Sequence, residues 1–167
     1  MSNKVKEVLL EHGRQVLRSE EFGNAFKQTH HTCTTVADHS LGVAVVAIVI
    51  SLFLLKLHIK VNLKVIVIAS LCHDLGILGR YEKFRNNAEC CKGHPIDSVQ
   101  VYKSVVEDGD ERTEDAIRHH MWPLTPMPPR YIEGFILTVA DKISALMEVM
   151  GIAPMRGLEL SPYQGPL

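Results

Sequence analysis

Apolar residues recur three and four positions apart along most of the chain, which is the spacing of one face of an α-helix. Strands would instead show alternation of apolar and polar residues, and the sequence has neither such alternation nor an internal repeat. We therefore predict an all-α, single-domain helical bundle of about six main helices. They are expected at residues 3–18, 36–57, 63–75, 94–106, 111–120 and 129–150.

Capping residues mark the ends of two of these helices. Thr35 and Asp38 form the Ser/Thr-x-x-Asp pattern of a capping box, in which two side chains satisfy unpaired amides at a helix start. Asn62 can cap the next helix, and Gly76 can end it. His73 is then expected in the last turn of that helix.

Prolines are expected to open the fourth and the last helices. Because proline is tolerated at the first helical position, His94-Pro95 is expected to start one helix and Pro129 the other. Residues 76–93 then form a loop or a short helical excursion. In the last helix we expect an apolar stripe to face the core, with Asp141 on its flank. The stripe consists of Ile132, Phe135, Val139, Ile143, Leu146 and Met150.

Composition narrows the class of protein. With 167 residues, the chain suggests one domain, and 18 basic against 19 acidic residues give no sign of a nucleic-acid partner. Residues 41–55 carry no charge, but a membrane span needs about 20 apolar residues, so a core helix is expected and no membrane association. Four cysteines without CxxC spacing, and no secretory signal, predict free thiols in the cytoplasm.

Three regions differ in their role. Residues 1–30 are predicted to form a helical segment packed on the core, and residues 31–150 the main domain. Residues 151–167, rich in proline and glycine, are predicted to be an irregular tail. The apolar helices at 41–55 and 132–150 leave a homodimer open.

The chemistry is expected where a long apolar run ends in His73 and Asp74. Buried ionisable groups need hydrogen-bond partners, a counter-charge or a metal. Helix bundles build metal sites from inward-facing side chains, and mixed imidazole and carboxylate ligands suit Fe, Mn, Zn or Co rather than Mg alone. The candidates are His39, His73, Asp74, His94, His119 or His120, and Asp141. Each alone has an ordinary structural explanation, so the metal prediction depends on the group.

Several motifs of the chain resemble those of the HD-domain superfamily of metal-dependent phosphohydrolases. They are DHSLGVA, which contains His39, LCHDLG, which contains His73 and Asp74, and TVADKI, which contains Asp141. KGHPIDSV and AIRHHMWPLTP further resemble a bacterial subgroup with six ligands and two metals, related to HD-GYP phosphodiesterases and diadenosine tetraphosphate hydrolases. The chain lacks the GYP signature, which argues against cyclic dinucleotides as substrate. The resemblance covers residues 31–150.

The resemblance implies two divalent transition-metal ions. The first would be held by His39, His73, Asp74 and Asp141, with Asp74 as a bridge. His94 and His120 would hold the second, with His119 as the alternative to His120. The implied activity is hydrolysis of a phosphate ester or anhydride, of a nucleotide in particular, by a metal-activated hydroxide.

A phosphoryl group also needs cationic partners. Arg80, Lys83, Arg85 and Arg118 are expected to bind substrate, together with His31 at the mouth of the site. Asp74, Lys142 and Arg80 are the residues assigned to catalysis, although Lys142 points about 100° away from Asp141 on a helix and ranks below the loop residues. Two other functions remain open: a di-iron oxygenase of the HD type, and a regulatory module that binds a metal or nucleotide without turnover.

Overall fold

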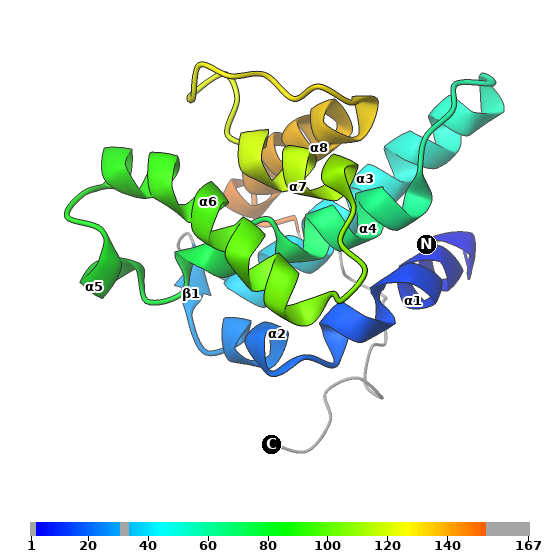
Figure 1. The fold of residues 1–167 in the computed structure, drawn as a ribbon. Helices are drawn as coiled ribbons and strands as arrows, with labels where there is room; N and C mark the ends of the chain where they lie inside the picture. Colours follow the sequence, from blue (N-terminus) through cyan, green and yellow to red (C-terminus); the bar gives the residue numbers. More distant parts are fainter. Residues whose placement is uncertain (1–2, 31–33, 153–167) are drawn as a thin grey trace.

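The computed structural model describes residues 3–30 and 34–152, which fold almost entirely into α-helices (Figure 1). The elements are α1 (Asn3–Leu17), α2 (Glu20–Ala25), β1 (Thr29–His30), β2 (Thr34–Thr35), α3 (Val36–Lys56), α4 (Leu63–Cys72), the 3-10 helix η1 (Leu75–Ile77), α5 (Arg80–Lys83), α6 (Asn87–Val105), α7 (Glu111–His119) and α8 (Ile132–Val149). The two short strands pair antiparallel. The prediction of an all-α bundle is confirmed.

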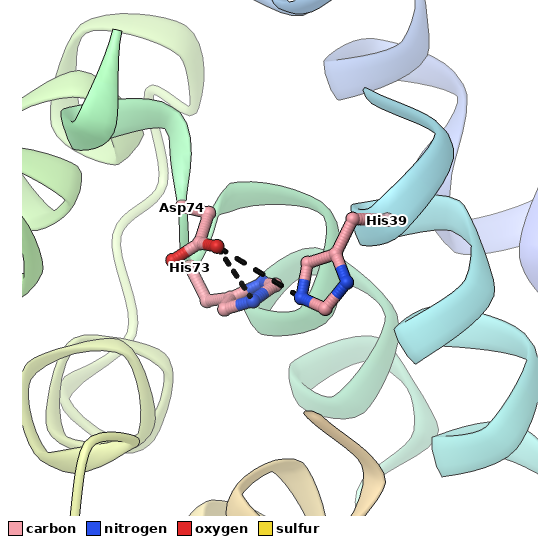
Figure 2. A group of neighbouring side chains, drawn as sticks. All are labelled: His39, His73 and Asp74. Carbon is pink, nitrogen blue, oxygen red and sulfur yellow. Dashed lines mark ion pairs between the residues drawn. The ribbon is translucent and has the colours of Figure 1, made fainter. Parts of the chain in front are cut away.

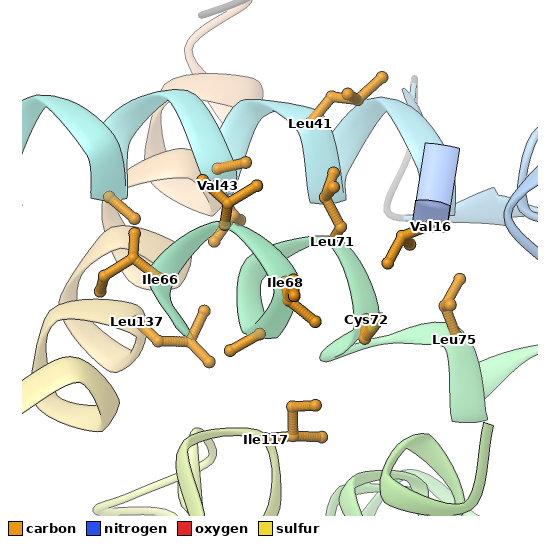
Figure 3. Packing of buried hydrophobic residues seen from close by; sticks show 14 of the residues in the cluster. Val16, Leu41, Val43, Ile66, Ile68, Leu71, Cys72, Leu75, Ile117 and Leu137 are labelled. Atoms are coloured by element: carbon orange, nitrogen blue, oxygen red, sulfur yellow. The ribbon is translucent and has the colours of Figure 1, made fainter. Parts of the chain in front are cut away.

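Helix α4 lies at the centre of the bundle, in contact with α1, α3, α7 and α8. Every residue from Val65 to Cys72 is buried, because the segment is apolar on all sides and can only be stable when surrounded. Figure 3 shows its side chains packed between those of the neighbouring helices, for example Val43 of α3, Ile117 of α7 and Leu137 of α8. The carboxyl end of this central helix therefore delivers residue 73 to the middle of the molecule.

Helix α3 contains the long uncharged run of residues 41–55. Among the described residues it is the one helix whose length and composition would allow it to cross a membrane, and 56% of its most apolar window is buried inside the bundle. It packs along both α4 and α8. This burial agrees with the prediction of a core helix.

The predicted N-caps Thr35 and Asn62 are confirmed. Thr35 Oγ1 accepts a hydrogen bond from the Asp38 amide at 3.1 Å, and Asp38 Oδ2 accepts one from the Thr35 amide at 3.2 Å. Asn62 Oδ1 accepts hydrogen bonds from the amides of Lys64 and Val65, which begins α4 directly after its cap.

Three predicted helix boundaries are wrong: the end of α4 at Gly76, the start of α6 at His94-Pro95 and the start of α8 at Pro129. Helix α4 ends at Cys72, so His73 and Asp74 follow the helix instead of lying in its last turn. Helix α6 begins at residue 87, because the Asn86 side chain caps it by accepting a hydrogen bond from the Glu89 amide at 2.9 Å. Pro95 therefore lies inside α6, where it costs a backbone hydrogen bond but is buried in the core.

The predicted orientation of α8 is also wrong. The helix starts at Ile132 instead of Pro129, and the stripe expected to face the core is exposed from Phe135 onward. Its opposite face is buried instead and carries small residues such as Gly134, where a Cβ would lie 2.5 Å from the Cβ of Pro129. Because these side chains are small, α8 can approach its neighbours closely with this face. Close packing therefore determines which face of α8 turns inward, which the spacing of apolar residues does not.

The N-terminal helices belong to the same hydrophobic core as the rest. Val8 and Leu9 of α1 and Phe22 of α2 are fully or almost fully buried in it. Of the tail predicted at residues 151–167, the part from residue 153 on lies outside the described residues.

Replacing Gly76 by alanine is expected to destabilise the fold. A Cβ at this position would overlap the backbone nitrogen of Ser98 and the carbonyl oxygen of His94, neither of which can rotate away. We expect a loss of about 2 kcal/mol or more in the free energy of unfolding, measured by urea denaturation. The matched control is Gly23→Ala in α2, which has nothing within 4 Å and should be neutral or stabilising. Equal stability of the two variants would contradict this packing.

Candidate metal centre

Five helices and the turns that follow them bring four imidazoles and two carboxylates together. His39 comes from α3, His94 from α6 and Asp141 from α8. His73 and Asp74 follow α4, and His120 follows α7. Figure 2 shows His39, His73 and Asp74 turned toward one another. The four histidines and Asp74 are buried, and the side chain of Asp141 is 16% exposed.

Asp74 lies between two pairs of histidines. Its Oδ2 atom is 3.5 Å from His73 Nε2 and 3.9 Å from His39 Nε2. Its Oδ1 atom is 3.2 Å from His94 Nε2 and 3.5 Å from His120 Nε2. Each carboxylate oxygen therefore faces a different pair of imidazoles, and the donor atoms form two groups, either of which could hold a metal ion.

Asp141 lies beside the first of these groups. Its Oδ1 atom lies 3.1 Å from His39 Nε2 and 3.9 Å from His73 Nε2. In the second group, the Nε2 atoms of His94 and His120 lie 3.1 Å apart. The first group thus has two imidazoles and the Asp74 carboxylate, with the Asp141 carboxylate beside both imidazoles, and the second has two imidazoles and the shared carboxylate.

Three of the four imidazoles use the other ring nitrogen to bond a backbone carbonyl of their own helix. The Nδ1 atoms of His73, His94 and His120 donate to the carbonyl oxygens of Ser70 at 2.8 Å, Cys90 at 2.8 Å and Ile117 at 2.7 Å. A neutral imidazole with its proton on Nδ1 has a bare lone pair on Nε2. All three lone pairs point into the centre, and His73 Nε2 has no hydrogen-bond partner although it is buried. Two facing lone pairs 3.1 Å apart repel unless a cation or proton lies between them, so this donor set fits metal ions.

Glu148 holds the fourth imidazole and was missed by the sequence analysis. Its Oε1 atom accepts a hydrogen bond from His39 Nδ1 at 2.8 Å, and its Oε2 atom accepts one from Thr34 Oγ1 at 3.0 Å. Seven residues separate Glu148 from Asp141, which is two helical turns and places both on one face of α8. The seven-residue spacing from Asp141 could therefore have identified Glu148 from the sequence.

The electrostatics of the centre follow from its burial and its charges. Burial lowers the pKa of His39, but hydrogen bonds with Asp141 and Glu148 outweigh burial and raise that pKa to about 10. Burial dominates at His73 and lowers its pKa to about 4. Burial would raise the pKa of Asp74, yet the neighbouring histidines hold it well below its usual value. The centre therefore keeps its carboxylates ionised, which is the state that binds a metal ion.

His119 points away from this centre. Its Nδ1 atom lies 3.0 Å from Asp115 Oδ1, in a separate polar hollow that Arg118 and Arg130 also line. Of the two adjacent histidines, the structure thus brings His120 to the other candidate ligands.

A pocket of about 360 Å3 opens beside the second group of donors. Arg80 and Lys142 line it, and Lys142 Nζ lies 3.3 Å from the His120 carbonyl oxygen and 3.5 Å from Asp141 Oδ2. The long side chain of Lys142 thus reaches the pocket, although the sequence analysis ranked it below the loop residues. Ile77, Met121, Leu124 and Ala145 supply apolar lining.

The other predicted substrate-binding cations lie elsewhere. Lys83 is 3.8 Å from Asp97, and Arg85 is 3.1 Å from Glu89, both outside the pocket lining. Arg118 lines the separate hollow beside His119. His31 lies outside the described residues.

Removing the Glu148 carboxylate is expected to weaken metal binding by the centre. Carboxylates that orient a ligating histidine typically contribute 10- to 100-fold to metal affinity. We expect Glu148→Ala to lose about 10-fold or more, and Glu148→Gln to lose less because its amide oxygen can still accept from His39. Competition with a chromogenic chelator measures the affinity, and the exposed Glu7→Ala on α1 is the control. Unchanged affinity in Glu148→Ala would show that His39 needs no such support.

Comparison with protein-family models agrees with this geometry. The family model described as the HD domain matches residues 36–146. A conserved hypothetical protein from Pyrococcus furiosus is similar in structure, with a TM-score of 0.47 and 20% sequence identity over 95% of this chain and 89% of that one. No curated protein matches the sequence significantly. The HD-domain match spans most of the chain and includes every candidate ligand. The chain therefore belongs to the HD-domain superfamily of metal-dependent hydrolases.

Proposed function

We propose that the protein is a phosphohydrolase with a dinuclear metal centre, which cleaves a phosphate ester or anhydride of a nucleotide. The observation that carries this proposal is the position of Asp74, whose two oxygens face two separate histidine pairs. One carboxylate shared in this way suits two neighbouring ions better than one. The nucleotide part of the proposal depends on the family resemblance.

His39, His73, Asp74 and Asp141 would hold one ion, and Asp74, His94 and His120 the other. This mixture of nitrogen and oxygen donors suits Fe, Mn, Zn or Co. Two divalent ions held here would polarise a phosphoryl oxygen and lower the pKa of a bound water toward neutrality. The chain therefore needs no nucleophilic side chain for hydrolysis.

The residues that line the pocket would bind and orient the substrate. Arg80 and Lys142 place two positive charges on its wall, where they would bind and orient the negative phosphoryl group of a substrate. Arg80 is oriented by its hydrogen bond to Asn87 Oδ1 at 2.7 Å. Met121 and Leu124 line the same pocket and would contact the organic part of the substrate.

The two cations favour a substrate with negative charge, such as a phosphate ester or anhydride, but an oxygenase of the HD type could bind an anionic organic substrate in the same way. Oxygen uptake with an iron-loaded sample tests that alternative directly. Turnover of any phosphate substrate would exclude a module that only binds a metal or nucleotide.

Substitution of the central dipeptide is expected to abolish both metal binding and hydrolysis. Asp74→Ala removes the ligand shared by both donor groups, and His73→Ala removes a ligand of the first. We expect loss of bound metal by elemental analysis and loss of p-nitrophenyl phosphate hydrolysis. The control is His58→Ala, which alters a histidine between α3 and α4, outside both donor groups, and should have a smaller effect. Full metal content in both site variants would refute the centre.

Arg80→Ala and Lys142→Ala are expected to separate substrate binding from metal binding. Loss of one charged contact to a phosphoryl group should lower kcat/KM by about 10- to 100-fold with the metal content unchanged. Steady-state kinetics with p-nitrophenyl phosphate measures the effect. The matched control is Lys83→Ala, whose side chain pairs with Asp97 outside the pocket lining. Wild-type kinetics in both pocket variants would remove these cations from the mechanism.

A further inference from the structure

One face of α8 exposes a continuous series of apolar side chains, which we call the α8 stripe. Its residues follow one another at spacings of four, four and three positions and continue to the end of the helix. Their exposed fractions are far above those of core residues. They are Phe135 at 41%, Val139 at 50%, Ile143 at 39%, Leu146 at 59%, Val149 at 75% and Met150 at 57%.

The area of the stripe suits a protein interface. With total areas of roughly 150 to 200 Å2 per residue, these fractions leave roughly 500 Å2 of apolar surface in water. The largest apolar patch of an ordinary monomer is about 300 to 600 Å2 and is often functional. A standard interface buries about 800 Å2 on each partner, of which roughly 60% is apolar, or about 500 Å2. The α8 stripe by itself would supply the apolar part of such an interface.

The chemistry of the stripe fits a second copy of this chain. In a twofold dimer the same patch meets itself, so any charge near the axis would lie beside its own symmetry mate. The six residues of the stripe are uncharged. Lys142 lies on the same side of the helix, but its Nζ is directed away from the stripe, to the His120 carbonyl oxygen and Asp141 Oδ2, so the stripe can pair with itself without bringing like charges together. Its ridge of side chains at spacings of three and four residues is the surface that packs against another helix.

A membrane surface fits the stripe less well. Helices that lie on membranes usually carry Lys and Arg on their polar face, which attract anionic lipids. Of the four charged residues of α8, Glu133, Asp141 and Glu148 are buried or nearly buried, and Lys142 is the exposed one. One lysine does not make the basic polar face that an anionic bilayer attracts.

We propose that two copies of this chain associate through their α8 stripes in a twofold dimer. Asp141 and Glu148, which belong to the metal centre, point away from the stripe toward His39. The dimer contacts would therefore lie on the outer face of α8, and the inner face of the same helix would carry the ligand Asp141. Leu146→Glu would place a negative charge in the interface of each copy and leave the ligands in place.

Sedimentation equilibrium of the full chain tests this proposal. The wild-type protein is expected to have twice the chain mass of 18.7 kDa at micromolar concentrations. Leu146→Glu should raise the dimer dissociation constant at least 100-fold, and Val139→Glu is a second variant that should do the same. The matched control is Leu57→Glu, the same substitution at a leucine that is 54% exposed at the far end of α3. Circular dichroism and metal content establish that each variant is folded.

A dimeric wild type that Leu146→Glu and Val139→Glu dissociate, while Leu57→Glu does not, supports the proposal. A monomeric wild type overturns it, and so does a monomer that sediments with phosphatidylserine vesicles, because the stripe would then face a membrane. Dissociation by Leu57→Glu to the same extent, or persistence of the dimer in both α8 variants, overturns the assignment to this face. These outcomes are independent of hydrolysis, so failure of the dimer would leave the proposed function untouched.

Discussion

The structure depends on the burial of imidazole nitrogens that face one another and the Asp74 carboxylate at one point. His73, His94 and His120 each commit Nδ1 to a backbone carbonyl of their own helix, which leaves Nε2 without a proton in the neutral ring. Burying a polar atom without a partner costs about 1–3 kcal/mol, and placing two lone pairs face to face adds repulsion. Positive charge between these atoms removes both costs. Metal ions and the helix ends that surround them are therefore expected to stabilise one another.

The bundle meets this constraint by bringing the ends of several helices to one point. The carboxyl end of the fully buried α4 carries the two central residues, and Gly76 lets the following turn lie directly against α6. Helix α8 approaches through its small-residue face and contributes Asp141 and Glu148 from positions two turns apart. As a result, its large apolar residues other than Ile136 and Leu137 remain on the outside. The orientation that completes the centre thus also creates the exposed stripe.

Much of the fold could be predicted from the sequence, because local signals decide it. The capping residues Thr35 and Asn62 define helix starts through contacts within four residues, and the uniformly apolar α4 can only be a core helix. The start of α6 was missed because a cap at Asn86 outweighs the preference of Pro95 for a first turn. The inward face of α8 could not be read from periodicity, since it depends on close approach to other helices.

For the candidate site too, local sequence motifs identify some residues, and tertiary packing determines the others. Motifs of neighbouring residues identified His39, His73, His94 and Asp141 as members of one group, and the structure places them together. The choice between His119 and His120 depends on how α7 is turned in the bundle, which sequence spacing does not determine. Glu148 and the reach of Lys142 into the pocket depend likewise on tertiary packing.

The most direct test of the central claim is the metal content of the protein, measured by elemental analysis after purification without a chelator or a histidine tag. Two donor groups that share Asp74 predict about two transition-metal ions per chain. About one ion would contradict the dinuclear centre and leave the pair of His94 and His120 with another purpose. Absence of metal even after reconstitution would contradict the account as a whole.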